Sequence, residues 1–529
     1  MSKKNGNILA IGICFFLFAM ISFVTGLQNP MGVIVKTQFG ASNAMSQLGT
    51  LANFIAYAFL GLPAGFILKR KGYKFTSLIA VAVGFVGVGI SFLSGVVESF
   101  SIYLLGAFVS GFSMCLLNTV VNPLLNNLGG GGNKGNRLIQ LGGSLNSLAA
   151  TIVPVFVGYL IGDAAKASIS DANPALFIAM AIFALAFVII LFSYIPEPDL
   201  EAAKENKEKE EGTKALIKGA LSYRNFVFGI IAIFLYVGIE VGIPNTVNLY
   251  LTTQTKEQLK QSYVANEAVI NGAVEQDYLP YFEAYLASKS KALTKFVNEK
   301  RITSDDDIYV LTEYMKEDKA AEIKRVAKAD KLTSEEALNK ILSEQNKENL
   351  KKINNPDYQE GKGMDPGAAG AIVGFYWLLM LIGRLVGGVI GGKVSSRAMV
   401  ATVSAFALFF LSLGILLPGT LVKFPSVTSE LSFAMTEIPL GVVFFVLCGL
   451  CTSVMWGAIF NLAVEGLGKY TSIASGLFMV MVCGGGILPF VQGLVADGVG
   501  FMPSFWVLVV AVAFILWYAL YGSKVVKRS

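Results

Sequence analysis

Long apolar runs, separated by short polar stretches, recur along the whole chain. Each run is about 20 residues long, the length that an α-helix needs to cross a bilayer. The pattern therefore predicts twelve membrane-spanning helices, with ends defined to within a few residues. The predicted spans are residues 8–28, 47–68, 75–97, 101–125, 138–161, 174–194, 225–251, 368–392, 398–420, 437–464, 471–495 and 501–521.

Composition agrees with this pattern. The chain has 54% hydrophobic residues, 55 glycines and only 15% charged residues, with a mean hydropathy of +0.61. These values are not those of a soluble globular chain, so we expect an all-α polytopic membrane protein. The chain has no histidine, and its five cysteines fall within predicted spans. We therefore expect no metal, no cofactor and no enzymatic centre.

Lysine and arginine gather in the short loops on one side of the twelve-span arrangement, together with both ends of the chain. Because cytoplasmic loops carry an excess of these residues, both termini are expected in the cytoplasm and the chain in the inner membrane, surrounded by lipid. The net charge of +6 reflects this basic face and does not indicate a nucleic-acid partner.

The spans form two groups of six, divided by a charged linker that a proline opens. Segments 127–158 and 466–493 resemble each other, as do 61–72 and 383–397. Parallel six-span repeats are typical of transporters that move two bundles around a central site, although small-residue patterns also serve helix packing. The predicted parts are a six-helix bundle 1–194, a cytoplasmic linker 195–223, span 7 at 224–251, an insert 252–365, spans 8–12 at 366–522 and a cytoplasmic tail 523–529.

The insert 252–365 is highly charged, with 18 basic and 21 acidic residues, so neither sign dominates. Thr-Ser pairs followed by acidic residues indicate helix starts within it. The loop charges place it outside the cytoplasm. Two interpretations are open: a helical cap over the entrance, with a surface for another protein, or a passive solvated insertion.

Polar residues at bilayer depth are costly and often mark a pathway. In the first half of the chain they are amides: Gln28, Asn29, Asn118, Asn122, Gln140 and Asn146. An amide both donates and accepts hydrogen bonds, so several together suit the hydroxyls of a neutral solute. Hydrogen bonding between packed helices is the alternative.

The second half adds an acid, an amide and aromatic rings: Glu240, Asn245, Tyr376, Trp377 and Trp456. Aromatic faces stack on the apolar faces of sugar rings, but they also serve packing. Glu240 is the only carboxylate well inside a predicted span. With Arg384 it forms either a structural ion pair or part of a transport mechanism.

At these residues the chain resembles the fucose/galactose/glucose:proton symporter branch of the major facilitator superfamily. The matching segments are TVVNPLLNNLG, RLIQLGGSLNSLAATIVPVFVG, FLYVGIEVGIPNTVNLYL, GFYWLLMLIGRLVGG and NLAVEGLGKYTSIASGLFMVMVCGGGILPFVQGLVAD, which cover both halves but not the insert. The resemblance implies a twelve-span fold and sugar uptake driven by protons. It also implies gating roles for Gly65, Arg70, Gly72, Arg137, Arg384 and Glu465, although Lys69 replaces the Asp that is usual in the loop after span 2.

The family's acids in spans 1 and 4, which serve proton coupling and sugar binding, correspond to Asn29 and Asn118. Its span 5 Asn corresponds to Asn146 and its span 7 Glu to Glu240. An asparagine still binds a hydroxyl but does not exchange a proton near pH 7. Facilitated diffusion, coupling through Glu240 and sodium coupling all remain open.

We therefore expect a secondary transporter of a neutral monosaccharide, such as a hexose, a deoxyhexose or an amino-sugar derivative. A non-transporting receptor or scaffold, in which the insert binds a partner, is the alternative. The sequence leaves the identity of the sugar and the oligomeric state open.

Overall fold

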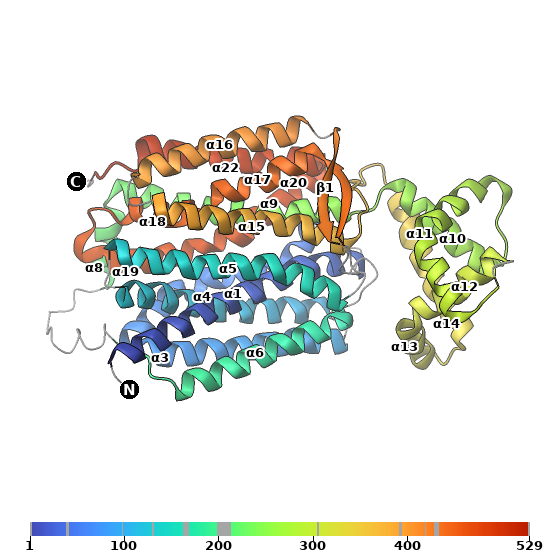
Figure 1. The fold of residues 1–529 in the computed structure, drawn as a ribbon, viewed down its shortest axis with the longest axis horizontal. Helices are drawn as coiled ribbons and strands as arrows, with labels where there is room; N and C mark the ends of the chain where they lie inside the picture. The colour runs from blue at the N-terminus through green and yellow to red at the C-terminus, as the bar shows by residue number, and fades with distance from the viewer. Residues whose placement is uncertain are drawn as a thin grey trace. The chain divides into compact units, whose positions relative to one another are not determined.

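A computed structural model describes residues 3–38, 42–97, 99–129, 132–161, 169–197, 213–303, 306–390, 394–417, 419–427 and 433–526. Contacts divide the chain into two compact units. One unit consists of Met1–Thr252 and Met364–Ser529, and the other of Thr253–Gly363. Long helices form the first unit (Figure 1).

The first half of the larger unit consists of helices that run back and forth along it (Figure 1). Its elements are α1 (Lys3–Gln38), α2 (Asn43–Ser46), α3 (Leu48–Val97), α4 (Phe100–Leu128), α5 (Gly132–Ile161), the 3-10 turn η1 (Ile169–Ala172) and α6 (Asn173–Phe192). The apolar stretches of α1, α3, α4 and α6 coincide with predicted spans, whereas that of α5, Leu141–Val153, is shorter than the predicted span 138–161.

Helix α3 contains two predicted spans and breaks between them at Gly72, where φ is 84°. This left-handed conformation is open to glycine without a steric penalty. The helix restarts immediately, and its first free amides, on Tyr73 and Lys74, donate to the carboxylate of Glu197 at 2.6 and 2.9 Å. The sharp turn after the second predicted span is thus fixed by a glycine and a capping carboxylate.

The second half of the larger unit begins in the predicted linker, of which residues 198–212 lie outside the described part. Its elements are α8 (Thr213–Leu221), α9 (Arg224–Thr252), α15 (Pro366–Ile390), α16 (Ser396–Leu416), β1 (Leu421–Val427), β2 (Phe433–Pro439), α17 (Leu440–Thr452), α18 (Met455–Val464), η3 (Gly468–Tyr470), α19 (Thr471–Val480), η4 (Met481–Cys483), α20 (Gly484–Val499), α21 (Phe501–Ser504), α22 (Trp506–Trp517) and the π-helical turn η5 (Tyr518–Gly522).

Two features depart from the all-α expectation. Strands β1 and β2 pair antiparallel as a hairpin between α16 and α17, where the sequence predicted a helix end, a loop and a helix start. The predicted span 437–464 is also not one straight helix, because α17 and α18 are bent by 42° at a short break. Among the described residues, nine helices are long and apolar enough to cross a membrane, or ten with this bent pair.

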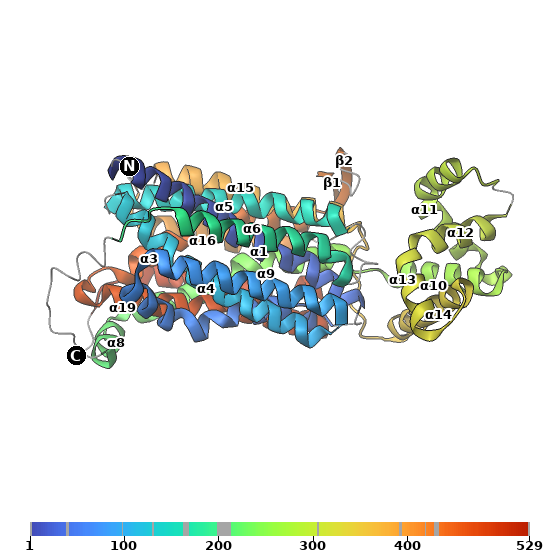
Figure 2. The same cartoon turned by 90° about the horizontal axis from the view of Figure 1, so that it is seen from below.

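The smaller unit consists of helices (Figure 2). It has a hydrophobic core of its own. Its elements are α10 (Lys256–Asn271), η2 (Gln276–Tyr278), α11 (Leu279–Lys300), α12 (Asp307–Asp318), α13 (Ala320–Asp330) and α14 (Ser334–Asn354). Thr333 begins α14 with a capping box to Glu336, so the Thr-Ser pattern marks a helix start there. The two ends of the smaller unit meet, because the amide of Gly363 donates to the carbonyl of Thr253 at 2.8 Å.

Candidate functional site

A cavity of about 180 Å³ lies between the two halves of the larger unit. Helices α1, α3, α4 and α5 form its wall on one side, and α9, α15, α18 and neighbouring segments form the other. Its polar lining residues are Ser22, Thr25, Thr50, Tyr57, Asn118, Asn122, Asn146, Glu240, Asn245, Trp377, Arg384, Ser453 and Trp456. Most of the polar residues that the sequence singled out therefore share one cavity.

Three asparagines of the first half line the cavity with their amide groups held in a fixed orientation. The amide nitrogen of Asn118 donates to the backbone carbonyl of Met114 at 3.1 Å, that of Asn122 to the carbonyl of Asn118 at 3.0 Å, and that of Asn146 to the carbonyl of Phe18 at 3.1 Å. A backbone carbonyl only accepts, so each contact identifies which end of the amide is nitrogen.

The opposite ends of these three amides are oxygens. Within the described part of the chain, the oxygens of Asn118, Asn122 and Asn146 receive no hydrogen bond. Asn118 also donates to the hydroxyl of Tyr57 at 2.8 Å, so both of its N–H groups are used within the protein. This wall of the cavity therefore offers mainly acceptors.

A fourth asparagine joins the two halves. The amide nitrogen of Asn245, on α9, lies 2.9 Å from Gln47 Oε1 and 3.4 Å from Thr50 Oγ1, both from the first half. Asn245 is buried and lines the cavity. Its hydrogen bonds to Gln47 and Thr50 would have to break if the two halves moved apart at these residues.

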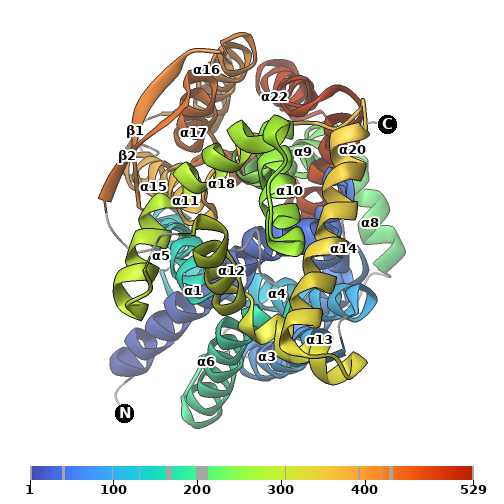
Figure 3. The ribbon, with the colours of Figure 1, turned by 90° about the vertical axis from the view of Figure 1, so that its right-hand side faces the viewer.

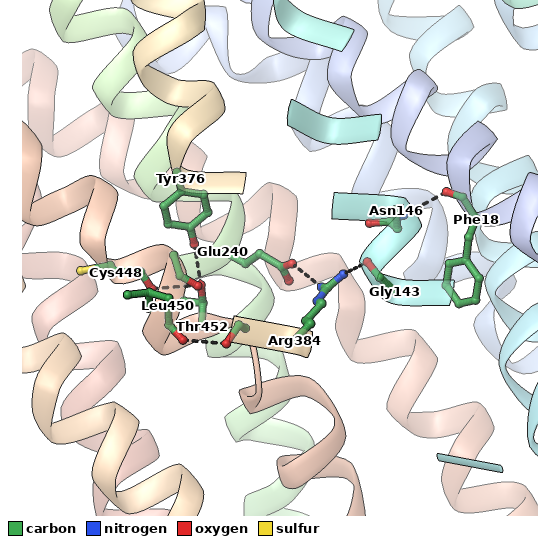
Figure 4. Close-up of polar contacts among 11 residues, drawn as sticks. Phe18, Gly143, Asn146, Glu240, Tyr376, Arg384, Cys448, Leu450 and Thr452 are labelled. Atoms are coloured by element: carbon green, nitrogen blue, oxygen red, sulfur yellow. Dashed lines mark hydrogen bonds and ion pairs between the residues drawn. The ribbon is translucent and has the colours of Figure 1, made fainter. Parts of the chain in front are cut away.

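The only charged side chains among the described lining residues form an ion pair. Arg384 Nη2 lies 3.3 Å from Glu240 Oε1, and the two side chains are only 12% and 14% exposed. The other terminal nitrogen of Arg384 donates to the backbone carbonyl of Gly143, on α5 (Figure 4). Arg384 therefore connects the acid of its own half to the backbone of the opposite half.

The predicted aromatic residues divide into two groups. Trp377 and Trp456 line the cavity. Tyr376 does not, because its ring is buried and its hydroxyl lies 3.0 Å from that of Thr452, away from Arg384 (Figure 4). Successive residues on a helix point in directions about 100° apart, and here Trp377 faces the cavity whereas Tyr376 packs against Thr452.

Several predicted residues lie outside the cavity or outside the described part. Nothing is described of the side chains of Gln28, Asn29, Gln140 and Arg137. Among the residues predicted for gating, Gly72 forms the break in α3 and the carbonyl of Glu465 accepts from Asn225 at 3.0 Å. Gly65 and Arg70 lie near the same break, and their gating role stays a prediction.

The polar lining residues Ser22, Thr25, Thr50, Tyr57 and Ser453 were not predicted from the sequence. Tyr57 lies in a run of apolar and small residues and gave no local signal. The hydroxyl of Thr25 donates to Ile21 of its own helix at 2.9 Å, a common way to place a threonine in an apolar helix. Whether each of these residues faces the cavity depends on how the helices pack against one another, which the sequence does not show.

The geometry defines a class first: a multi-pass membrane protein with a polar cavity between two groups of helices. The family model described as Major Facilitator Superfamily matches residues 12–272. The chain is 23% identical to a glucose/galactose transporter of Brucella abortus over 99% of this chain and 96% of that protein. It is 21% identical to a putative glucose/galactose transporter of Helicobacter pylori over the full length of both.

A further relative is the L-fucose-proton symporter of Escherichia coli, which is 22% identical over 45% of this chain and 60% of that protein. Among solved structures, a fucose:proton symporter in the outward conformation has a TM-score of 0.57 at 15% identity, covering 98% of this chain and all of that chain. The family model and these relatives together support a place for the chain in the fucose/galactose/glucose symporter branch of the major facilitator superfamily.

Proposed function

We propose that this protein is a secondary transporter that moves a neutral monosaccharide across the membrane by alternating access, with the cavity as its binding site. The names of its relatives, glucose/galactose transporter and L-fucose-proton symporter, support sugar transport. None of the relatives named above is called a receptor or an enzyme.

The observation that carries the proposal is the row of amide oxygens in the cavity wall. Because their nitrogens are held by backbone carbonyls, Asn118, Asn122 and Asn146 present acceptors. A sugar hydroxyl has a proton to donate to such an oxygen, whereas a carboxylate or phosphate has none. The carboxylate of Glu240 adds a further acceptor. The site therefore favours neutral, hydroxyl-rich solutes over anionic sugars.

The opposite wall supplies apolar surface. Trp377 and Trp456 line the cavity from the second half, and indole faces suit the C–H faces of a pyranose ring. A sugar held by amides on one side and by tryptophans on the other would contact both halves at once. This arrangement is what alternating access around a central site requires.

The membrane topology is part of the proposal. The nine candidate helices reach twelve spans when α3 counts as two, α5 is included and the bent pair α17 and α18 forms one. The basic loops then place both termini in the cytoplasm and the inserted unit, Thr253–Gly363, outside it. We also propose that the protein lies in the inner membrane. For the insert we propose that it caps the entrance of the transporter, and the alternative is that it binds another protein.

Coupling is proposed to depend on Glu240 if an ion is coupled at all. Asn118 cannot take up and release a proton near pH 7, so the acid in span 7 is the described lining residue that could bind a proton or a sodium ion. Its partner Arg384 would then be released or rearranged during the cycle.

Uptake of radiolabelled glucose, galactose, fucose and N-acetylglucosamine into proteoliposomes tests the function. We expect uptake of at least one neutral sugar and weaker apparent binding in Asn146→Ala, by about tenfold for one hydrogen bond of about 1.4 kcal/mol. The matched control is Asn298→Ala, an exposed amide in the smaller unit, which should behave as the wild type. Absence of flux for every sugar would contradict the proposal.

Imposed proton or sodium gradients, applied to the wild type and to Glu240→Gln, test the coupling. Accumulation that a gradient drives and the substitution abolishes would assign the coupling to Glu240. Equilibration that neither alters would identify a uniporter.

A further inference from the structure

The hairpin β1–β2 has one face against the helices and one face uncovered. Residues along β2 alternate between exposed and partly buried until its last two, which are buried. On the inner face, the ring of Phe424 meets the ring of Phe375, on α15, edge to face at 5.1 Å. Figure 3 shows the hairpin at the periphery of the helices, beside α15 and α17.

The contact with α15 gives the depth of the hairpin. Phe375 lies nine residues after Pro366, the first residue of α15, which is about 14 Å along the axis at 1.5 Å per residue. Helix α15 has 25 residues, about 37 Å, which exceeds the thickness of a hydrocarbon core by only a few ångströms. The hairpin therefore packs against the side of α15 in the half of the helix nearest Pro366, toward one boundary of the membrane.

The uncovered face is apolar at both ends of the hairpin, at Phe433 and Met435 toward the turn and at Leu421 at the base. Phe433 is 92% exposed, Met435 62% and Leu421 55%. On α16, the helix before the hairpin, Phe409 and Leu416 are also exposed. A ring that is almost fully exposed beside lipid-facing helices is suited to lipid and poorly suited to water.

Charges occupy the other part of the same face. Lys423 lies opposite Glu437 in the register, between Leu421 and the apolar tip. Both side chains are long enough to reach the headgroups while their apolar stems stay against the surface. The outer edges of a two-stranded sheet also leave backbone groups that need polar partners, which the hydrocarbon core does not supply. An interfacial position satisfies both requirements.

We propose that the β1–β2 hairpin is a lipid-binding element that inserts Phe433, Met435 and Leu421 into the headgroup and acyl boundary of the bilayer. It anchors the second half of the transporter beside α15, the helix that carries Trp377 and Arg384. The ligand is phospholipid at the interface, as for other interfacial amphipathic elements.

Site-directed fluorescence in lipid nanodiscs tests this assignment. A polarity-sensitive maleimide dye is attached to Phe433→Cys, and the five native cysteines, all buried, serve as the labelling background in the wild type. Phe409→Cys provides a lipid-facing reference on α16, and Asn298→Cys provides an exposed reference in the smaller unit. Because Phe433 is almost fully exposed, its replacement leaves the fold intact.

We expect the dye at position 433 to emit to the blue of the dye at position 298. A shallow nitroxide lipid should quench it at least twofold more than it quenches the dye at 298, and aqueous iodide should quench it at least twofold less. Behaviour like that at 298 would overturn the proposal, because the tip would lie in water. Protection from both quenchers would also overturn it, since a protein surface would then cover the tip. Neither result depends on sugar transport, so the uptake assay tests the proposed function independently of this experiment.

Discussion

Breaking the pair of Arg384 and Glu240 should destabilise the protein more than removing both charges together. The two atoms are 3.3 Å apart and both side chains are largely buried. At an effective dielectric constant of about 20, Coulomb attraction at this distance is about 5 kcal/mol. Desolvation of the two ions offsets much of it, so the pair itself contributes little.

Removing one partner removes the Coulomb attraction but leaves the desolvation cost of the remaining ion. Arg384→Met leaves Glu240 as an uncompensated charge, and Glu240→Gln leaves the guanidinium without its counter-charge, beside the neutral carbonyl of Gly143. A single break of a buried pair costs about 3–5 kcal/mol. The double variant lacks both charges, so we expect a loss smaller than that of either single variant, which requires a coupling energy larger than one single loss, about 3–5 kcal/mol or more.

Thermal unfolding of the purified variants in one detergent measures this cycle. We expect both single variants to melt well below the wild type and the double variant to recover part of the difference. Arg384→Lys is the matched control, because it keeps the charge but loses the fork that reaches Glu240 and Gly143 together. A double variant whose decrease in Tm equals the sum of the single decreases would refute the reasoning, since the two groups would then act independently.

Three further changes test other parts of the structure. Asp497→Asn weakens the contact in which this carboxylate accepts the amides of Asn43 and Ala44 at 2.7 and 3.0 Å. We expect the two halves of the larger unit to separate more often at this contact, seen as faster labelling of a cysteine introduced at Ser22 in the cavity wall, and an unchanged rate would exclude a gating role. Replacing residues 254–362 by a short glycine-serine link should leave the larger unit folded, because the two ends of the smaller unit meet. Loss of the monodisperse peak in gel filtration would contradict this expectation. Sugar uptake by the folded variant then tests whether the insert acts as a cap. Asn118→Asp restores a titratable group in the cavity, so uptake should depend more on pH between 5 and 8 than in the wild type, and parallel pH profiles would show that this position takes no part in coupling.

Much of the helical framework follows from local pattern. An apolar run of about 20 residues is stable in a bilayer only as a helix, so the predicted span 225–251 coincides with α9, Arg224–Thr252. The same rule singled out Asn118, Asn146 and Glu240, because polar groups stand out in an apolar run. All three line the cavity.

The details of the site depend on contacts between distant segments. The amide of Asn146 is oriented by the carbonyl of Phe18, 128 residues away, and Arg384 reaches a carbonyl 241 residues away. No local pattern encodes such contacts, and for the same reason it does not show that Tyr376 packs beside Thr452 and not in the cavity lining.

The sequence by itself determined a helical membrane protein, its apolar spans and the polar residues within them, because hydropathy is a property of each segment alone. Only the tertiary structure decided which helix faces meet, which end of each amide faces the cavity, where α17 and α18 bend and that residues 421–439 form a hairpin. These features depend on the packing of one segment against another, which changes the conformation that each segment prefers in isolation.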